Sequence, residues 1–452
     1  MKFFLHDILV LILLSATGCS TLGRQIAYDN TVEIAKYPMS DTAEIGWRIK
    51  TFWTEVLLSS WRRYVSFPVL KIRNVPAICS TGEEMKPEIM TRWLHRRSGD
   101  PVAGEIKMLL NGDAFFPEFK NSILSATRRI DLKTYIFDND DVAKKIADLL
   151  IEKAQEIPVR VLYDSAGTRM AWNVHAPSLP KNYIYEVRDM VHYLAAGGIA
   201  LQRACHTLMT SEHSKYFLID DLAYFGGMNI GREYRYDWRD AMFEITGPAV
   251  NLLKNYFNES WEYAGGTRQK PEQTIENPAH LPEHIFFAVT TPFRAHIYKG
   301  QLRAIKNAKQ RIYIENPYLW NMPIVYQLCA ARKRGVDVRV TVPRDVNHGI
   351  GISANKKTVK LLLDHGVRVF IYPGMTHVKA AVYDQWACFG SANFDDLSLH
   401  KNYELNIFTS DKDTVEMIAA GLLKQGQGLS TETFEIDITL KELFFARFAQ
   451  YL

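Results

Sequence analysis

The sequence contains few cysteines, and their spacing does not pair them. Cysteine occurs five times in 452 residues, and no two of the five form a C-x-x-C motif. This argues against a zinc ribbon and against a thioredoxin-type redox pair. If the chain is exported, disulfides are permitted, but the sequence does not specify how Cys79, Cys205, Cys329 and Cys388 would pair.

A low-complexity tract, a long run of one charge and a metal-binding signature are also lacking. The 54 Lys and Arg residues against 50 Asp and Glu leave a formal charge of +4, which does not indicate a nucleic-acid-binding protein. The chain has no H-E-x-x-H motif, and we expect neither a metal nor another cofactor. With 47% hydrophobic and 12% aromatic residues, the composition is that of a folded globular protein and excludes a collagen or a disordered chain.

The N-terminus is typical of an export signal. Lys2 precedes an apolar stretch from Ile8 to Leu14, and Gly18 comes directly before Cys19. Residues 1–19 resemble a bacterial lipoprotein signal, which implies that Cys19 is lipidated and that the protein is attached to a membrane of the cell envelope, facing the periplasm or the extracytoplasmic side. The alternatives are an ordinary signal, an uncleaved anchor or a structural segment. An anchor would need about 20 apolar residues to span a bilayer.

Residues 20–104 form an N-terminal extension with an aromatic and basic segment. Between Gly46 and Tyr64 the chain has three Trp and four basic residues against one acid, a composition suited to a membrane interface. The alternative is an ordinary amphipathic helix packed on the rest of the protein.

The remainder of the chain repeats a β-α-β pattern. The first copy has strand patterns at 130–137 and 159–163 around a helical pattern at 142–154; the second has them at 311–315 and 335–342 around 324–333. A further helix, a glycine and a strand follow in each copy. We therefore expect an α/β fold, a duplicated α/β sandwich with halves at 105–268 and 280–425. Residues 426–452 should end in a helix that opens with a capping box, Thr439 to Glu442.

One spaced motif occurs at the same place in both copies. The pattern is H-x-K-x4-D-x5-G-[GS]-x-N, which is expected by chance on the order of once in 10⁵ such chains. Its first copy contains His213, Lys215, Asp220, Gly226, Gly227 and Asn229, and its second contains His377, Lys379, Asp384, Gly390, Ser391 and Asn393. A single histidine of this kind is usually a buried structural residue, but duplication of the whole pattern indicates a functional site.

The residue types in this motif suit cleavage of a phosphodiester. A histidine and a lysine two apart on a strand project from the same face. Two such pairs supply a nucleophile, a proton donor for the leaving alkoxide and positive charge around the phosphate oxygens. Asp220 and Asp384 lie at the opposite parity and next to probable turns, so we assign them structural or orienting parts in the catalytic motif rather than direct attack.

The motifs resemble those of the phospholipase D superfamily, and most closely the bacterial cardiolipin synthase branch. The similar stretches are Gly226–Tyr234, Trp238 with Asp240, Gly247–Val250, Gly390–Ser398 and Asn402–Glu404. The resemblance covers about 110–409. It implies a phospholipase D-type sandwich in which two pseudo-symmetric halves share one active site.

The resemblance also implies roles for these residues. His213 would attack phosphorus to give a phosphohistidine, and His377 would act as acid and base. Asp240 and Glu404 would each fix the tautomer of a histidine, with plain solvated carboxylates as the alternative. The phosphate would be bound by Lys215, Lys379, Asn229, Asn393, Gly227 and Ser391.

Four functions remain open at this stage. The first is a membrane-associated phosphatidyltransferase that forms cardiolipin-type lipids from phosphatidylglycerol. The second is a phospholipase D that hydrolyses phospholipids to phosphatidic acid. The third is a phosphodiesterase or nuclease of the same superfamily, and the fourth is a non-catalytic membrane scaffold. We expect a phospholipid substrate and a membrane surface as partners and no nucleic acid; the sequence does not indicate an oligomeric state.

Overall fold

The computed structural model describes residues 66–79, 82–204, 210–267, 274–277, 281–347 and 349–448. Cys19, Cys205 and the aromatic segment at 46–64 therefore lie outside the described residues. No helix in the described part of the chain is both long and apolar enough to cross a bilayer.

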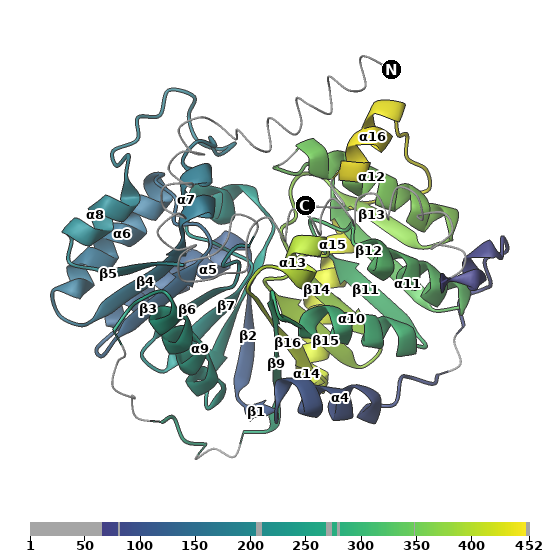
Figure 1. Cartoon of the computed structure of the whole chain (residues 1–452), viewed down its shortest axis with the longest axis horizontal. Helices are drawn as coiled ribbons and strands as arrows, with labels where there is room; N and C mark the ends of the chain where they lie inside the picture. Colours follow the sequence, from purple (N-terminus) through teal and green to yellow (C-terminus); the bar gives the residue numbers. More distant parts are fainter. Residues whose placement is uncertain are drawn as a thin grey trace.

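Two mixed sheets form the centre of the protein (Figure 1). The first sheet has the strand order β2 (Glu105–Leu110), β8 (Ala241–Thr246), β7 (Leu222–Gly226), β6 (Lys215–Ile219), β3 (Ile130–Thr134), β4 (Val159–Asp164) and β5 (Ala200–Ala204). The second has the order β1 (Val102–Ala103), β9 (Glu283–Thr291), β16 (Glu404–Thr409), β15 (Trp386–Gly390), β14 (Ala380–Tyr383), β11 (Arg311–Glu315), β12 (Asp337–Pro343), β13 (Arg368–Tyr372) and β17 (Thr431–Thr433), with β10 (Arg294–Ala295) beside β9.

The two sheets repeat one topology. The seven-strand order of the first sheet recurs from β9 to β13 in the second, strand for strand. Parallel pairing joins β3, β4 and β5 in one half and β11, β12 and β13 in the other. This confirms the expected duplicated α/β fold. The helices of the two β-α-β units are α6 (Asp141–Ala154) and α11 (Met322–Lys333).

The N-termini of these two helices are fixed by equivalent side chains. Asp140 accepts hydrogen bonds from the N–H groups of Val142 and Ala143, and Asn321 accepts one from Ile324. Such caps satisfy backbone donors that a helix leaves unpaired in its first turn. Each helix therefore begins shortly after its strand, β3 or β11. It begins at the end of that strand that lies nearest the histidine motif.

Helices cover the outer face of each sheet, and the inner faces pack against each other (Figure 1). The first sheet is covered by α5 (Asn111–Ser125), α6 and α8 (Met190–Ala196), and the second by α10 (His296–Asn307), α11 and α12 (Gly349–Asp364). Between the sheets, the rings of Phe243 and Phe389 lie 4.2 Å apart, and α9 (Ala249–Tyr263) packs into the same core. The halves are therefore joined by a continuous apolar interface.

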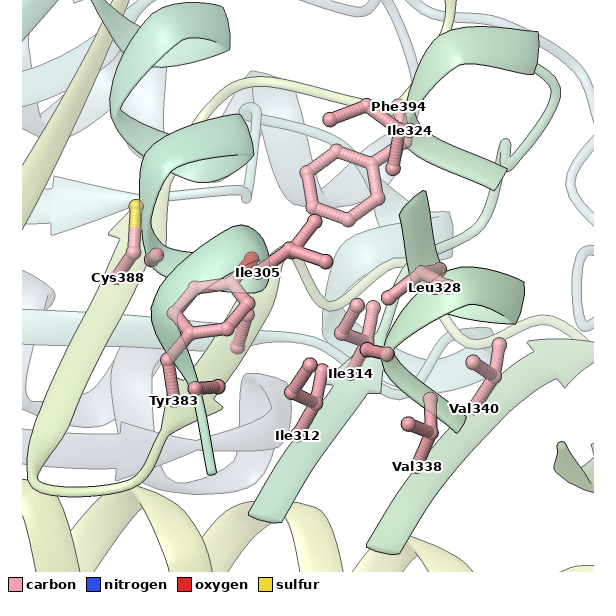
Figure 2. Close-up of a cluster of buried hydrophobic side chains, with 14 of the residues drawn as sticks. Ile305, Ile312, Ile314, Ile324, Leu328, Val338, Val340, Tyr383, Cys388 and Phe394 are labelled. Atoms are coloured by element: carbon pink, nitrogen blue, oxygen red, sulfur yellow. The ribbon is translucent and has the colours of Figure 1, made fainter. Parts of the chain in front are cut away.

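Figure 2 shows why the strands of the second half bury their outward faces. Ile312 and Ile314 of β11 and Val338 and Val340 of β12 point to the same side, as residues two apart on a strand do. They pack against Leu328 of α11 and its neighbours.

The N-terminal and C-terminal segments both pack on the second half. Residues 66–79 and 82–86 run along it, where the N–H of Cys79 donates to the carbonyl oxygen of Gly335 at 2.7 Å, and α4 (Glu88–Ser98) follows against α10. At the other end, α16 (Leu440–Phe448) opens with reciprocal hydrogen bonds between Thr439 and Glu442. Glu442 also forms an ion pair with Lys356 of α12. Among the described residues, Cys79 and Cys388 are free thiols.

Candidate active site

The two histidine segments meet where the halves adjoin, through an exchange of backbone hydrogen bonds. The N–H of His213 donates to the carbonyl oxygen of Tyr403 at 2.9 Å, and that of His377 donates to the carbonyl oxygen of Arg239 at 2.6 Å. Parallel bridges pair Glu212 with Tyr403 and Arg239 with Thr376. Each histidine is therefore joined to the segment of the other half that leads into Asp240 or Glu404.

Each imidazole is held by a carboxylate from the opposite half. His213 Nδ1 lies 2.8 Å from Glu404 Oε1, and His377 Nδ1 lies 2.7 Å from Asp240 Oδ2. A carboxylate oxygen accepts a hydrogen bond from an N–H group, so this contact places a hydrogen on Nδ1 of each imidazole and leaves Nε2 available for reaction with the substrate. All four side chains are buried. Both histidines have a carboxylate partner, but Asp240, the partner of His377, has a shorter side chain than Glu404, the partner of His213.

Burial sets the protonation states of the histidines. It lowers the pKa of His213, with Glu404 opposing the change. The pKa of His377 falls well below its ordinary value because of burial and of the positive charges of Lys379 and Lys215. In contrast, burial raises the pKa of Asp240 to about 7. A proton held between Asp240 and His377 is therefore easily moved near neutral pH.

The two lysines lie beside their histidines in the same way. Lys215 Nζ donates to the carbonyl oxygen of His213 at 2.5 Å, and Lys379 Nζ donates to that of His377 at 2.6 Å. An ammonium has three N–H donors, so donors remain for a phosphate. Burial lowers the pKa of Lys215 to about 8 and that of Lys379 to about 7. A bound anion would raise both values again.

Ser391 and Gly227, expected at the phosphate, lie against the two carboxylates. Ser391 Oγ donates to Glu404 Oε2 at 2.5 Å. At the equivalent Gly227, an added Cβ would lie 2.5 Å from Asp240 Oδ1, so this position has no room for a side chain. Glu404 is thus stabilised by the hydroxyl of Ser391, whereas Asp240 fills the corresponding space beside Gly227.

The two asparagines of the motifs differ in their partners. Asn229 Oδ1 accepts from the N–H of Ile136 at 3.1 Å, and its Nδ2 donates to Tyr234 Oη at 2.6 Å. In the second half, Asn316 Oδ1 accepts the N–H of Tyr318, the counterpart of Ile136, and Asn393 Oδ1 is buried without a hydrogen-bond partner. Asn229 is thus fixed more firmly than Asn393.

Asp220 and Asp384 are not brought to the histidines. Each occupies a tight turn after β6 or β14 with a left-handed backbone, at φ 51° and 52°, at the far end of the strand that follows its histidine. The carboxylate of Asp220 accepts backbone N–H groups from Thr127, Arg128 and Arg129. That of Asp384 accepts four, from Met85, Lys309, Gln310 and Arg311. Both bind the chain that enters a central strand.

Aromatic walls beside the histidines were not expected from the sequence. The ring of Tyr135 lies 4.9 Å from that of His213, and the rings of Tyr234 and Trp238 lie 5.6 and 5.1 Å from that of His377. Tyr234 and Trp238 follow the first motif closely in the sequence, which was the available signal. Their rings limit the positions open to each imidazole.

The chain is similar to known proteins across most of its length. A family model described as "Cardiolipin synthase, PLD-like domain" matches residues 119–261 and 302–423, which include both motifs. A cardiolipin synthase of Geobacillus sp. (strain WCH70) is 30% identical over 391 residues, 78% of this chain and 73% of that protein. Cardiolipin synthase A of Pseudomonas fluorescens is 30% identical over 68% of this chain and 66% of its own length.

A solved structure has the same fold. The phosphatidylserine synthase of Haemophilus influenzae Rd KW20 superposes with a TM-score of 0.57 at 13% sequence identity, covering 76% of this chain and 92% of that one. At this identity the likeness concerns the fold alone.

Proposed function

Since the chain belongs to the cardiolipin synthase family with a phospholipase D-like domain, we propose that it is a membrane-associated phosphatidyltransferase that forms cardiolipin-type lipids from phosphatidylglycerol. The observation that carries this proposal is the pair of buried histidines, each with its Nδ1 held by a carboxylate of the other half. Transfer through an enzyme-bound intermediate needs two separate groups, a nucleophile and a proton donor. One histidine serves each purpose.

In the first step, Nε2 of His213 attacks the phosphorus of phosphatidylglycerol. A P–N bond forms, the P–O bond to the head-group glycerol breaks, and the proton of His377 goes to the departing alkoxide. His213 suits attack because its lowered pKa keeps it neutral. The proton comes from the His377–Asp240 pair, which holds one proton besides the Nδ1 hydrogen up to the raised pKa of Asp240, about 7. With that proton on Nε2, His377 can donate it to the alkoxide while Asp240 accepts the Nδ1 hydrogen.

In the second step, a hydroxyl of another phosphatidylglycerol attacks the phosphohistidine. His377 takes the hydroxyl proton, the new P–O bond forms and the P–N bond breaks, which returns both histidines to their starting states. Net transfer thus gives one cardiolipin and one glycerol for two phosphatidylglycerols. Water in place of the lipid hydroxyl would give phosphatidic acid.

Lys215 and Lys379 stabilise the phosphate oxygens in both steps. Each buried ammonium group donates to the carbonyl oxygen of one histidine and keeps further donors, which suits the charge that develops at phosphorus. Asn229 and Asn393 keep amide hydrogens for the same purpose. Ser391 and Gly227 act indirectly, through the space and the hydrogen bond that they give to Glu404 and Asp240.

Attachment to the membrane belongs to the same proposal. The apolar stretch before Gly18 and Cys19 supports lipidation of Cys19, which would place the enzyme on the extracytoplasmic side of a bacterial membrane. The aromatic and basic composition at 46–64 supports contact with the lipid interface. A lipid substrate would then be presented at the surface that holds the enzyme.

Lipid analysis tests the proposal directly. The purified full chain is mixed with phosphatidylglycerol vesicles, with and without phosphatidylethanolamine, and the lipids and free glycerol are quantified. We expect cardiolipin and glycerol in equal amounts. Phosphatidic acid as the main product would identify a hydrolase instead, and an absence of product from both vesicle types would contradict a lipid substrate. The His213→Asn protein controls for contaminating activity.

A further inference from the structure

Behind His377 lies a buried ion pair to which the mechanism above assigns no part. Arg239 directly precedes Asp240, and Thr376 directly precedes His377. Arg239 Nε donates to Glu315 Oε1 at 3.0 Å, and Thr376 Oγ1 donates to the same oxygen at 2.5 Å. The side chains of Arg239 and Glu315 are 1% and 0% exposed. One carboxylate oxygen therefore binds both segments that carry the His377–Asp240 pair.

The geometry of these segments places the ion pair on their rear side. Arg239 and Thr376 are bridged through their backbones, and successive residues of an extended segment point to opposite sides. With Asp240 and His377 facing each other on one side, Arg239 and Thr376 face Glu315 on the other. A shift of Glu315 would move both segments and change the alignment of Asp240 Oδ2 with His377 Nδ1.

The guanidinium of Arg239 also connects this ion pair to the helical segment that contains Leu422 and Gln425. It donates to the carbonyl oxygen of Leu422 at 2.8 Å and to Gln425 Oε1 at 3.2 Å. The second oxygen of Glu315 is buried without a hydrogen-bond partner. A Cβ added at Gly426 would lie 2.4 Å from that oxygen. The chain thus retains a costly, incompletely paired carboxylate at this place.

The other half has a counterpart of reversed polarity behind His213. Lys133 pairs with the residue after Lys215, and Glu315 pairs with the residue after Lys379, so the two occupy equivalent places. Lys133 Nζ lies 3.1 Å from Glu212, which precedes His213. Each histidine therefore has its own buried ion pair, built from different residues.

We propose that Arg239 and Glu315 are positioning residues for His377. They hold Asp240 and His377 in the alignment that proton transfer to the leaving alcohol requires. This inference rests on the acid and base role proposed for His377. It extends that role to a pair that contacts neither substrate nor the imidazole.

The test compares two leaving groups. Glycerol leaves as an alkoxide that needs a proton, whereas p-nitrophenolate leaves without one. We expect Glu315→Gln to slow turnover of phosphatidylglycerol by about 10- to 100-fold with KM nearly unchanged, part of the 10²- to 10⁴-fold that general acid catalysis supplies. Turnover of a short-chain phosphatidyl p-nitrophenyl ester should fall by less than about 3-fold in its first step, measured as the burst of p-nitrophenolate. Arg239→Lys, which keeps the charge, should recover part of the loss that Arg239→Met causes.

Two variants serve as controls. Lys133→Met breaks the equivalent pair behind His213 and should slow both substrates alike, since attack by His213 precedes departure of either group. Arg368→Met removes an arginine pair with Glu432 between β13 and β17, and should affect stability more than either rate. Circular dichroism and thermal melting identify any variant that fails to fold, and Glu315→Gln, which keeps the side-chain shape, then carries the test.

The pH profile gives a second readout. The charged groups that act on Asp240 are Lys379, Lys215 and Glu315, and those that act on His377 are Lys379, Lys215 and His213. Because the charge of Glu315 raises the pKa of Asp240, the His377–Asp240 pair of Glu315→Gln should lose its proton at lower pH, which moves the alkaline limb of kcat to lower pH. The inference would be overturned if Glu315→Gln slowed both substrates equally and left the alkaline limb of the pH profile unchanged. If the wild type cleaves an alkyl phosphodiester but makes no cardiolipin, the proposed function fails, while the same comparison on the alkyl and nitrophenyl esters still decides the positioning role.

Discussion

At the scale of single residues, the two histidines have the same neighbours by type but not by detail. Glu404 is braced by Ser391, whereas Asp240 is shorter and fills the space that Gly227 leaves. Burial and both lysines lower the pKa of each histidine, but Glu404 opposes the lowering for His213. Such differences let two like side chains perform different parts of one reaction.

The buried charges predict a pH dependence near neutrality. At low pH, protonation of His213 prevents its attack, so activity falls as pH decreases, and the lowered pKa of His213 places this limb below the ordinary histidine range. Above pH 7 to 8, the His377–Asp240 pair loses the proton that it gives to the leaving alcohol, and Lys379 and Lys215 lose their charge, so activity falls as pH rises. We expect a narrow bell in kcat/KM, measured from initial rates between pH 5 and 10.

Substrate binding should widen the bell-shaped pH profile on its alkaline side only. A phosphodiester anion between the lysines favours their charged forms and raises their pKa values. The alkaline limb of kcat should therefore lie at higher pH than that of kcat/KM, with the acidic limbs closer together. A profile that stays flat across neutrality would contradict the assignment of these groups.

The roles of the two histidines predict which variant can be labelled. His213→Asn removes the nucleophile and should form no covalent adduct. His377→Asn keeps the nucleophile, and with a p-nitrophenyl phosphodiester it should accumulate label on His213, because departure needs no proton but activation of the acceptor is impaired. Radiolabel transfer and peptide mapping measure this. Label on His377 of the wild-type protein would reverse the roles.

Much of the residue chemistry was accessible from the sequence, but its pairing was not. The repeated spacing indicated His213 and His377, and Asp240 and Glu404 were assigned to histidines. Which carboxylate serves which histidine depends on side-chain contacts between residues 137 and 191 positions apart. The ion pair of Arg239 and Glu315 carried no motif at all and needed the fold to become visible.

At the scale of helices and strands, the duplicated turns have the clearest structural purpose. Asp220 and Asp384 combine a left-handed backbone, which Asp and Asn tolerate better than most residues, with bonds to the chain that enters β3 or β11. Asp384 also binds the N–H of Met85 and so attaches the N-terminal segment to the second half. It is fully buried, whereas the side chain of Asp220 is 21% exposed.

We expect Asp384→Asn to be more destabilising than Asp220→Asn. Asn accepts the same backbone angles, so the change tests the hydrogen bonds, and its amide group turns a donor toward backbone donors. Bonds to a charged acceptor contribute about 1.5 to 3 kcal/mol each, and we expect a loss of about 2 to 4 kcal/mol for Asp384. Denaturant unfolding monitored by circular dichroism measures the difference. An equal loss at both sites would mean that Met85 and burial contribute little.

The periodic elements could be predicted, and the irregular ones could not. Alternating apolar residues located β3, β4, β11 and β12, and a 3.6-residue period located α6. The edge strands β1 and β17 span two and three residues, too few for a period. Residues 66–79 and 82–86 follow the second half through bonds such as that of Cys79 with Gly335, and an irregular segment of this kind has no period that the sequence could show.

At the scale of the whole molecule, duplication predicted two sheets, and the structure adds that neither half is complete alone. Each half supplies a histidine to its own motif and a carboxylate to the motif of the other half. The apolar interface that contains Phe243 and Phe389 keeps the sheets together. One folded chain therefore contains all of the groups that we propose to be catalytic.

This architecture predicts that two inactive variants cannot rescue each other. When purified His213→Asn and His377→Asn proteins are mixed, every chain lacks one histidine of its own site, and exchange of halves would require separation of the buried interface between the sheets. We expect the mixture to form no more cardiolipin than the sum of the two variants assayed separately, at any mixing ratio. Gel filtration of each variant checks that both are folded. Recovery of about a quarter of wild-type activity after the two variants are unfolded and refolded together would reveal halves exchanged between chains, and recovery on simple mixing would show that the active site is shared between chains.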